Sequence, residues 1–212
     1  MTLYRPTHFR VDDEAALLEF IGRHAFGTLV CDGADGLEVS HIPFLPKRGA
    51  DGSIRLLGHV ARANPQWQAL QQARHVVAIF QGPHAYVSPS WYANHPSVPT
   101  WNYSVVHAHG AVRPLDDAGL RELLDELSRT YEGDRANAWR MDSLPEEFVT
   151  KMMRAIVGFE MQVERLEGKF KLSQNRPEEI GRVVAALESE GEGEVAEMMR
   201  AHAPKPRSTI NS

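Results

Sequence analysis

The sequence predicts a mainly β protein with peripheral helices, in the α+β class, built on an antiparallel sheet. Three observations support this prediction. Short β-like runs before residue 61 are separated by turn signals at Asp32–Gly36 and Asp51–Gly52, a spacing typical of an antiparallel barrel or sandwich. The run 75–80, HVVAIF, is almost wholly apolar, as in a strand buried on both faces. Residues 157–164 alternate apolar and polar side chains, as in a half-buried strand.

The first half of the chain should consist mostly of strands, with one helix among them. The helix is expected after the third strand, because Asn64 is a good N-cap and Pro65 suits the first helical position. In chain order, the expected elements are strands at 23–30, 37–45 and 54–61, a helix at 65–72, and strands at 75–80 and 101–109.

The second half contains stronger helical patterns. Leu120, Leu123, Leu124, Leu127 and Tyr131 have the spacing of one helix face, and acidic residues precede them near the expected helix start. The remaining expected elements are a helix at 145–155, the alternating strand at 157–164, a basic strand at 169–173 and a last helix that begins at residue 177.

Composition narrows the class of protein. The chain has 212 residues, 42% hydrophobic and 24% charged, with a net charge of −5, which is ordinary for a globular protein. No apolar run is long enough to cross a bilayer, and residues 1–6 contain no apolar signal core. The single cysteine, Cys31, fits a reducing compartment, so we expect a cytoplasmic protein.

The charge and the motifs also argue against several functions. Negative net charge and dispersed basic residues disfavour direct DNA binding, because phosphate contacts need a basic face. The motifs G-x-S-x-G, G-x-G-x-x-G and H-E-x-x-H and the P-loop are missing from the sequence. His107 and His109 share one strand face, but no carboxylate or cysteine follows a matching metal-site spacing, so no metal is expected.

The segment from His59 to Tyr103 is expected to form a ligand pocket. At its start, a strand brings His59 and Arg62 to a helix N-terminus, where unpaired N–H groups and the helix dipole favour anions. Arg62 can add a two-pronged contact to a phosphate. The alternative is a surface arginine beside an ordinary helix cap.

Two further stretches have the chemistry of a binding site. Residues 80–103 hold many aromatic, proline and amide groups in irregular backbone, which suits a flat heteroaromatic ligand. The alternative is a small satellite core that fixes a long loop. Lys169, Lys171 and Ser173 share one strand face and can hold an anion or an electron-rich ring edge, unless that face is simply solvated.

These blocks together resemble the PaiB family, whose members are called FMN-binding negative transcriptional regulators. The resemblance extends from about Tyr4 to the last helix, and its specificity comes from the number of blocks in order. The blocks are YxPxHF at 4–9, SHIPFL at 40–45, GHVARANP at 58–65, FQGPHAYVSPxWY at 80–92, PTWNY at 99–103, VGF at 157–159 and KFKLSQN at 169–175.

The resemblance implies a split β-barrel related to pyridoxamine-phosphate oxidase, with FMN as the cofactor. It implies a homodimer that holds the flavin nucleotide at the subunit interface. We expect the flavin-binding barrel over residues 1–175, with helices inserted at about 116–155. A C-terminal helical segment at 176–200 should pack on the barrel, and residues 201–212 should form a flexible tail.

The resemblance also implies roles for individual residues. His59, Arg62 and Asn64 would lie beside the phosphate, and Lys171 with Gln174 would lie beside the ring. No catalytic residue is predicted, although His41, His59 and His84 are candidates for proton transfer. The complete expected cofactor-binding set is His41, His59, Arg62, Asn64, Gln81, Trp101, Asn102, Lys171 and Gln174.

The predicted function is therefore that of an FMN-binding regulatory protein of the PaiB type, which does not read DNA through a basic helix. The first alternative is a flavin-dependent oxidoreductase that acts on a small metabolite or on free flavin, with the cofactor carrying the redox chemistry. The second is a haem-binding split barrel, with His84, His107 or His109 as the axial ligand.

Overall fold

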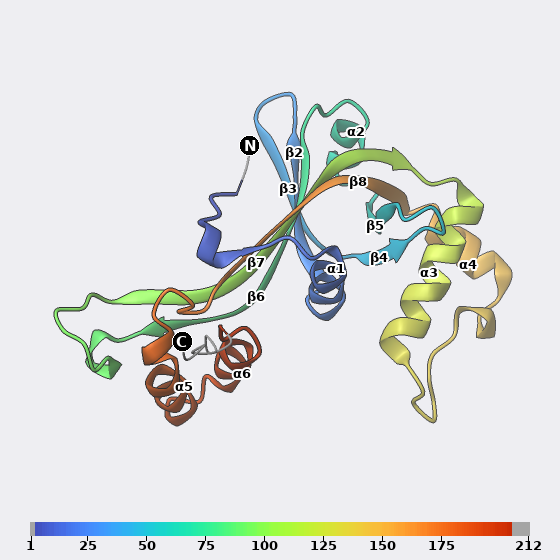
Figure 1. Ribbon diagram of the computed structural model, residues 1–212. Coiled ribbons are helices and arrows are strands. Elements are labelled where there is room, and N and C mark those ends of the chain that lie inside the picture. Colours follow the sequence, from blue (N-terminus) through green and yellow to red (C-terminus); the bar gives the residue numbers. More distant parts are fainter. Residues whose placement is uncertain (1–2, 205–212) are drawn as a thin grey trace. The chain divides into compact units, whose positions relative to one another are not determined.

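The computed structural model describes residues 3–204, and the last residues of the predicted tail, 205–212, lie outside this range (Figure 1). The described chain divides into two compact units. Unit 1 contains residues 3–13, 81–106 and 167–204, and unit 2 contains residues 14–80 and 107–166. The three longest strands, β6, β7 and β8, each contribute residues to both units.

The strands are hydrogen-bonded in the order β3-β2-β6-β7-β8-β5-β4, and β1 pairs with β8. The pairs whose register is defined are antiparallel, which confirms the predicted mainly β, antiparallel class. The strands are β1 (Arg10–Val11), β2 (Phe26–Asp32), β3 (Leu37–Pro43), β4 (Leu45–Arg48), β5 (Ile54–Ala61), β6 (Val76–Val87), β7 (Thr100–Pro114) and β8 (Ile156–Lys171).

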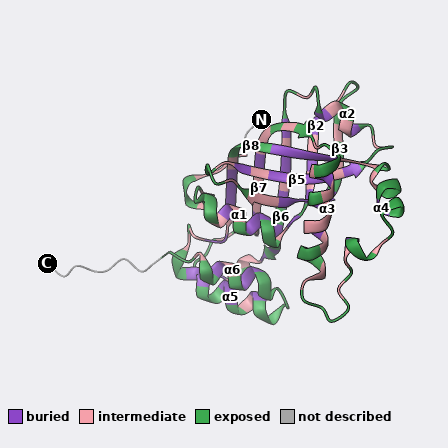
Figure 2. Cartoon of the chain, turned by 90° about the vertical axis from the view of Figure 1, so that its right-hand side faces the viewer, coloured by how far each residue is buried: buried purple, intermediate pink, exposed green. Residues whose placement is uncertain are grey.

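The core of unit 2 includes an aromatic cluster. The Phe44 ring lies 5.2 Å from that of Phe80 and 6.2 Å from that of Phe159, both edge-on. β5 runs beside this cluster because Gly58 has no side chain: a Cβ there would be 2.9 Å from the ring of Phe159. This close approach sets the position of the neighbouring His59 on β5. Figure 2 shows that the buried residues are concentrated on the strands.

The helices of unit 2 include the predicted amphipathic helix. In α3 (Asp117–Glu132), Leu120, Leu123 and Leu127 are buried, and the Asp116 side chain accepts a hydrogen bond from the Gly119 N–H at 2.8 Å. This contact caps the first turn, as the sequence predicted for an acidic start. The other helices of unit 2 are α1 (Glu14–Arg23), α2 (Gln66–Leu70), η3 (Met141–Ser143) and α4 (Glu146–Met153).

Unit 1 contains a pair of helices that lie side by side, α5 (Ile180–Ser189) and α6 (Gly193–Ala201) (Figure 1). α5 buries Ile180, Val183, Val184 and Leu187, the face that the sequence predicted. The shorter elements of unit 1 are η1 (Thr7–Phe9), η2 (Pro89–Trp91) and η4 (Pro177–Glu179). Among the described residues, no helix is both long and apolar enough to span a membrane.

Several predicted boundaries are wrong. The strand expected at 23–30 begins only at Phe26, because residues 14–23 form α1, with Leu17, Phe20 and Ile21 buried at helical spacing. The helix expected at 65–72 is the shorter α2. The C-terminal segment, expected to be helical at 176–200 with its last helix beginning at residue 177, contains two helices, and the second, α6, buries Val195, Ala196 and Met199.

Candidate functional site

A small polar cavity lies in unit 1 where β8 ends. Lys171, the last residue of that strand, donates hydrogen bonds from Nζ to Thr100 Oγ1 and to the carbonyl of Trp101, each at 2.5 Å. The cavity has a volume of about 180 Å³. Its lining residues are Tyr92, Val98, Thr100, Asn102, Lys171, Ser173, Asn175 and Arg176.

Two cations and no carboxylate line this polar cavity. Burial lowers the pKa of Lys171, and the nearby ammonium group of Lys169 lowers it further. The Arg176 guanidinium lies 4.7 Å from the centre of the Tyr92 ring and donates to Ser97 Oγ at 3.0 Å. Such a cavity suits an anion or the carbonyl-bearing edge of a ring.

A buried hydrogen-bonded pair fixes the far wall of the polar cavity. Asn102 is fully buried, and its Nδ2 donates to Ser173 Oγ at 3.0 Å. Ser173 has a φ of 66°, the left-handed region that non-glycine residues rarely occupy. Gln174 holds the same turn from the side, since Oε1 accepts from the Leu172 N–H and Nε2 donates to the Phe170 carbonyl. Both polar atoms of the Gln174 side chain are therefore bonded to the backbone of residues 170–172.

The remaining predicted residues of unit 1 lie on β6 and β7. Trp101 is 53% exposed, and its ring lies 6.0 Å from Tyr86 and 6.3 Å from His84. Gln81 Nε2 and His84 Nδ1 are 3.4 Å apart. Of the five predicted residues in unit 1, Asn102 and Lys171 line the polar cavity, and the Trp101 carbonyl binds the Lys171 ammonium.

In unit 2 the predicted phosphate segment follows β5. Arg62 donates from Nε to the Arg154 carbonyl at 2.7 Å and from Nη2 to the Ile156 carbonyl at 3.0 Å. Asn64 donates from Nδ2 to Ser40 Oγ at 2.8 Å and accepts from the Gln66 N–H at 3.0 Å. Both side chains therefore hold the backbone in this arrangement. α2 has only five residues, so the helix dipole is a weaker argument for an anion than the sequence indicated.

His41 lies apart from that turn, on the hairpin of β2 and β3. It is paired in register with Thr28, and its Nδ1 lies 3.0 Å from Thr28 Oγ1. The side chain is exposed. Its ring is therefore available to a ligand on this face of the hairpin.

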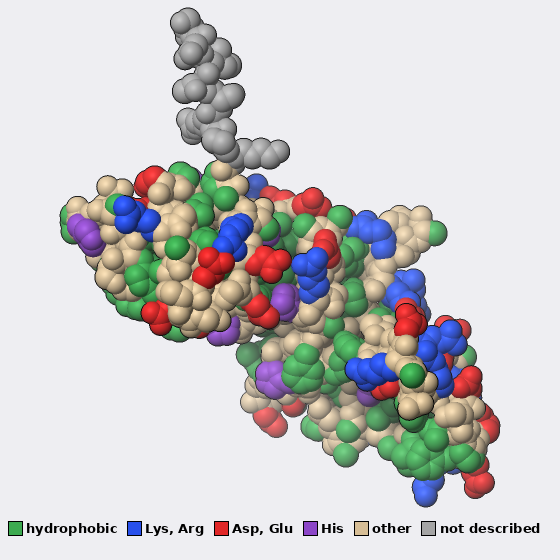
Figure 3. All heavy atoms as spheres, turned by 90° about the horizontal axis from the view of Figure 1, so that it is seen from below, with side chains coloured by type: hydrophobic (Ala, Val, Ile, Leu, Met, Phe, Trp, Pro, Cys, Tyr) green, Lys and Arg blue, Asp and Glu red, His purple; other side chains and the backbone are tan. Residues whose placement is uncertain are grey.

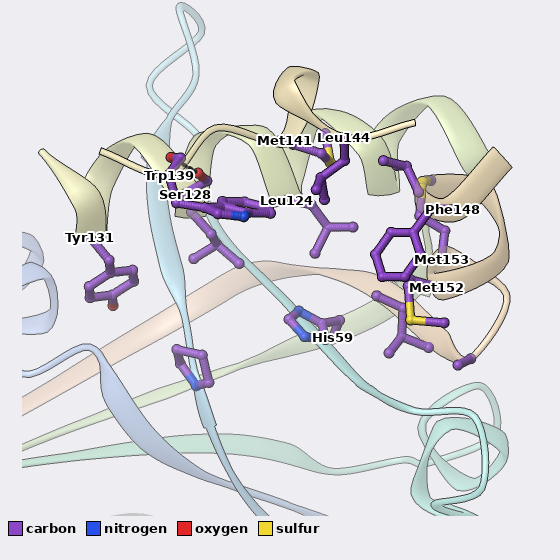
Figure 4. Close-up of a pocket in the computed structure, with 15 residues that line it drawn as sticks. His59, Leu124, Ser128, Tyr131, Trp139, Met141, Leu144, Phe148, Met152 and Met153 are labelled. Atoms are coloured by element: carbon purple, nitrogen blue, oxygen red, sulfur yellow. Dashed lines mark hydrogen bonds between the residues drawn. The ribbon is translucent and has the colours of Figure 1, made fainter. Parts of the chain in front are cut away.

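His59 lies at a large apolar cavity in unit 2 (Figure 4). Along β5 the core residues are Leu56, Gly58 and Val60, so His59 points to the opposite face, toward α3 and α4. Burial lowers the pKa of His59, which favours the neutral imidazole. Among residues 3–204, its buried Nδ1 has no hydrogen-bond partner.

The apolar cavity has a volume of about 590 Å³. Sequence reasoning missed it, because the stretch from residue 116 to 155 was interpreted as inserted helices without a ligand. The sequence feature that could have indicated the cavity is the run of large apolar residues that follows α3. The lining residues are Pro43, His59, Leu124, Leu127, Ser128, Tyr131, Trp139, Met141, Leu144, Phe148, Val149, Met152, Met153, Ala155 and Ile156.

Solved structures define the class of protein. The flavocytochrome Anf3 from Azotobacter vinelandii has a TM-score of 0.61 at 14% identity, over 79% of this chain and 72% of that one. The FAD and haem binding protein from Mycobacterium smegmatis has a TM-score of 0.57 at 15% identity, over 76% and 73% of the two chains. These similarities confirm the predicted fold, a split β-barrel of the kind found in flavin-binding proteins.

Sequence comparison then gives the family. Residues 3–165 match the model of the family described as "Putative FMN-binding domain". The chain is also 35% identical to "Protease synthase and sporulation protein PAI 2" of Bacillus subtilis over 189 residues, which cover 89% of this chain and 90% of the relative. The chain belongs to this FMN-binding PaiB family, so the predicted family and its cofactor, FMN, are confirmed. Lys171 and Gln174 lie beyond the residues that the family model matches.

Proposed function

We propose that this protein is an FMN-dependent regulatory protein of the PaiB type, which acts as a homodimer in the cytoplasm. The family match over residues 3–165 is the observation that carries the proposal. Bound FMN would supply one- and two-electron redox chemistry, and the protein would bind and orient it. The buried thiol of Cys31, which forms no disulfide in the described chain, agrees with a reducing compartment.

We assign the phosphate of FMN to Arg62 and Asn64 in unit 2, and we propose the exposed His41 as a separate contact to the cofactor. Arg62 is bonded to two backbone carbonyls rather than to a carboxylate, so a phosphate can replace a neutral acceptor with a charged one and gain the stronger bond. His59 is left out of this assignment. Burial lowers the pKa of His59, and its ring lines an apolar cavity without Lys or Arg, which would not stabilise a phosphate.

We assign the isoalloxazine ring to Lys171, Asn102, Trp101 and Gln81 in unit 1. The edge of that ring carries carbonyl oxygens, which the Lys171 ammonium can bind in place of the Thr100 hydroxyl. Trp101 is exposed enough to stack on a flat ligand. Gln174 would act as a positioning residue, since its side chain fixes the turn that follows Lys171.

Regulation would not require a DNA-reading helix. On the face seen in Figure 3, basic and acidic side chains are interspersed, and the net charge is −5. Both features disfavour direct binding to a phosphate backbone. We therefore propose that the regulatory signal passes through the flavin or through a partner protein. A gel shift with operator preference at physiological salt would contradict this part of the proposal.

FMN titration of the flavin-free protein tests the two assignments separately. We expect Arg62→Ala and Lys171→Met each to weaken FMN binding by about tenfold, the scale of one charge-assisted hydrogen bond. Arg129→Ala is the matched control, because Arg129 is exposed and pairs with Asp125 on its own helix. Quenching of flavin fluorescence gives the affinity, and thermal unfolding shows whether each variant is folded.

Two outcomes would change the proposal. If the protein does not bind FMN at micromolar concentration, or if neither variant has an effect, the flavin site is wrong. If bound FMN supports steady oxidation of NAD(P)H, the protein is an oxidoreductase rather than a regulator alone. Size-exclusion chromatography with light scattering tests the homodimer, and a stable monomer would contradict it.

A further inference from the structure

The apolar cavity of unit 2 has the size and shape of a small-molecule site. Its volume of about 590 Å³ lies within the range of roughly 300–1,000 Å³ that is typical of ligand pockets. β5 forms its floor, and α3, η3 and α4 form its walls (Figure 4). In that view Leu124 projects from α3 toward the ring of His59, so a ligand between them would contact both.

The lining excludes a charged ligand. None of the fifteen lining residues is Lys, Arg, Asp or Glu. Four carry polar side-chain groups: His59, Ser128, Tyr131 and Trp139, whose indole N–H is a donor only. The Ser128 hydroxyl already donates to the Trp139 carbonyl at 3.1 Å. A phosphate or carboxylate placed here would lose its hydration without gaining a countercharge, which is costly.

The lining also favours an aromatic ligand. Trp139, Phe148 and Tyr131 offer ring faces and edges, and each is roughly half exposed beside the cavity. Met141, Met152 and Met153 are unbranched and polarisable, so they can adapt to a flat molecule and make favourable sulfur–aromatic contacts. Flat aromatic molecules would therefore fill this space better than branched or flexible ones.

His59 is the lining residue that β5 contributes to the cavity, and it is polar. Its ring lines the cavity, and among the described residues its Nδ1 is buried without a partner. A neutral imidazole offers one N–H donor and one nitrogen acceptor. A hydroxyl or ring nitrogen on the ligand could pair with this ring, because either group matches one of those functions.

We propose that this cavity binds a small, uncharged aromatic molecule that carries one hydrogen-bonding group, which His59 recognises. None of the assigned FMN contacts lines the cavity, although Ile156, whose carbonyl binds Arg62, does, and the inference stands whether or not those assignments are correct. A second copy of the chain is the competing occupant, since apolar side chains surround the opening. The recessed imidazole favours a small molecule, because a protein surface would have to insert a polar group to reach it.

Calorimetric titration with two probes of similar shape tests the proposal. The probes are 2-naphthol, which has one hydroxyl, and 2-methylnaphthalene, which has none. We expect 2-naphthol to bind saturably, with one molecule per chain and a micromolar dissociation constant. His59→Leu should weaken binding of 2-naphthol by about three- to tenfold, the scale of one hydrogen bond, and leave binding of 2-methylnaphthalene unchanged. If His59→Leu changes the binding of both probes equally, His59 does not recognise the hydroxyl.

Leu124→Trp fills the cavity and should abolish binding of both probes. Leu37→Trp is the matched control: Leu37 is 64% exposed at the start of β3 and does not line the cavity. If Leu124→Trp does not fold, Met152→Trp fills the same space from its more exposed edge. Unchanged binding in a folded, filled variant would overturn the inference.

Two further measurements separate this inference from its competitors. If Leu124→Trp turns a dimer into monomers in light scattering, the cavity is a subunit contact and the inference fails. If 2-naphthol displaces FMN one for one, the cavity belongs to the flavin site and the separate site is overturned, while FMN binding itself stands. If 2-naphthol binds and FMN does not, only the proposed flavin function fails.

Discussion

The polar cavity of unit 1 and the apolar cavity of unit 2 each contain a half-buried base, Lys171 in one and His59 in the other, yet their linings suit opposite ligands. In both, burial lowers the pKa of the base. Lys171 keeps two oxygen acceptors at 2.5 Å, which favour its charged form. The buried Nδ1 of His59 has no partner in the described chain. The partners of the base, rather than its burial, decide whether a cavity takes charged or neutral groups.

The two units also differ in where they hold charge. Unit 2 buries Glu160 between Arg55 and Arg113, at 3.2 and 2.9 Å, and none of these residues lines the apolar cavity. Unit 1 places Lys171 and Arg176 directly on its polar cavity. The buried charges around Glu160 in unit 2 therefore stabilise the fold, while Lys171 and Arg176 in unit 1 are available to a ligand.

Removing the buried carboxylate of unit 2 should have the largest effect on stability. Glu160→Ala loses hydrogen bonds to two guanidinium groups, and we expect it to lower the free energy of unfolding by about 2–3 kcal/mol. Urea unfolding measures the change. Glu164→Ala is the control, because Glu164 lies on the same strand and is exposed. If Glu160→Ala folds but alters 2-naphthol binding, the buried charges of unit 2 also shape the apolar cavity. The distinction between structural charge in unit 2 and ligand-facing charge in unit 1 would then be wrong.

Removing the buried amide of unit 1 should have the next largest effect. Asn102→Ala leaves the Ser173 hydroxyl without its buried partner, and we expect a loss of about 1–2 kcal/mol. FMN affinity should fall as well, because the turn after Lys171 would lose its support. Asn137→Ala, at an exposed position in unit 2, should change neither quantity. A stable Asn102→Ala protein with full FMN affinity would show that this pair does not shape the polar cavity.

The sequence predicted the elements whose pattern depends on local burial. β5 and the helix face at 120–127 follow directly from apolar periodicity. α1 was missed although Leu17, Phe20 and Ile21 show the same spacing, because the strand-like run beside it dominated the interpretation. α6 is short, and acidic residues obscure its few buried ones.

The site residues were harder to predict, because their roles depend on partners far away in the sequence. The phosphate contact of Arg62 stays a prediction, and no local pattern indicates that its two carbonyl acceptors come from residues 154 and 156. His59 was grouped with Arg62 because one strand was expected to bring both to a helix N-terminus, whereas their side chains have different surroundings. Only the packing of α3 and α4 against β5 reveals the apolar cavity, and no local pattern encodes that packing.

Acid should lower the free energy of unfolding through protonation of Glu179 in unit 1. This buried carboxylate accepts hydrogen bonds from the Ala93 and Asn94 N–H groups and from Asn94 Nδ2. These donors lower the pKa of Glu179 from its ordinary value of 4.5. The stabilisation is therefore complete above that ordinary value and is lost as the pH falls through the lower, folded-state pKa.

Glu179→Gln tests this contribution, because it keeps the shape and removes the charge. We expect the variant to unfold at lower urea than the wild type at neutral pH, with a smaller further loss in acid. Glu178→Gln is the matched control at an adjacent, exposed position. If acid weakens Glu179→Gln and the wild type equally, the carboxylate does not contribute in this way.

The smallest effect should come from the strained backbone of Ser173. Its φ of 66° costs a non-glycine residue about 1–2 kcal/mol, whereas glycine adopts this conformation freely. Ser173→Gly should relieve that cost but lose the hydrogen bonds with Asn102 and gain chain entropy in the unfolded state, so the net change should stay within about 1 kcal/mol. Ser173→Ala loses the same bonds without relief, so it should be the less stable variant in urea unfolding. The reverse order would show that the positive φ costs less than the entropy that glycine adds to the unfolded chain. The turn beside the polar cavity would then be held with little backbone strain, and the contrast between a strained unit 1 site and a relaxed unit 2 site would be lost.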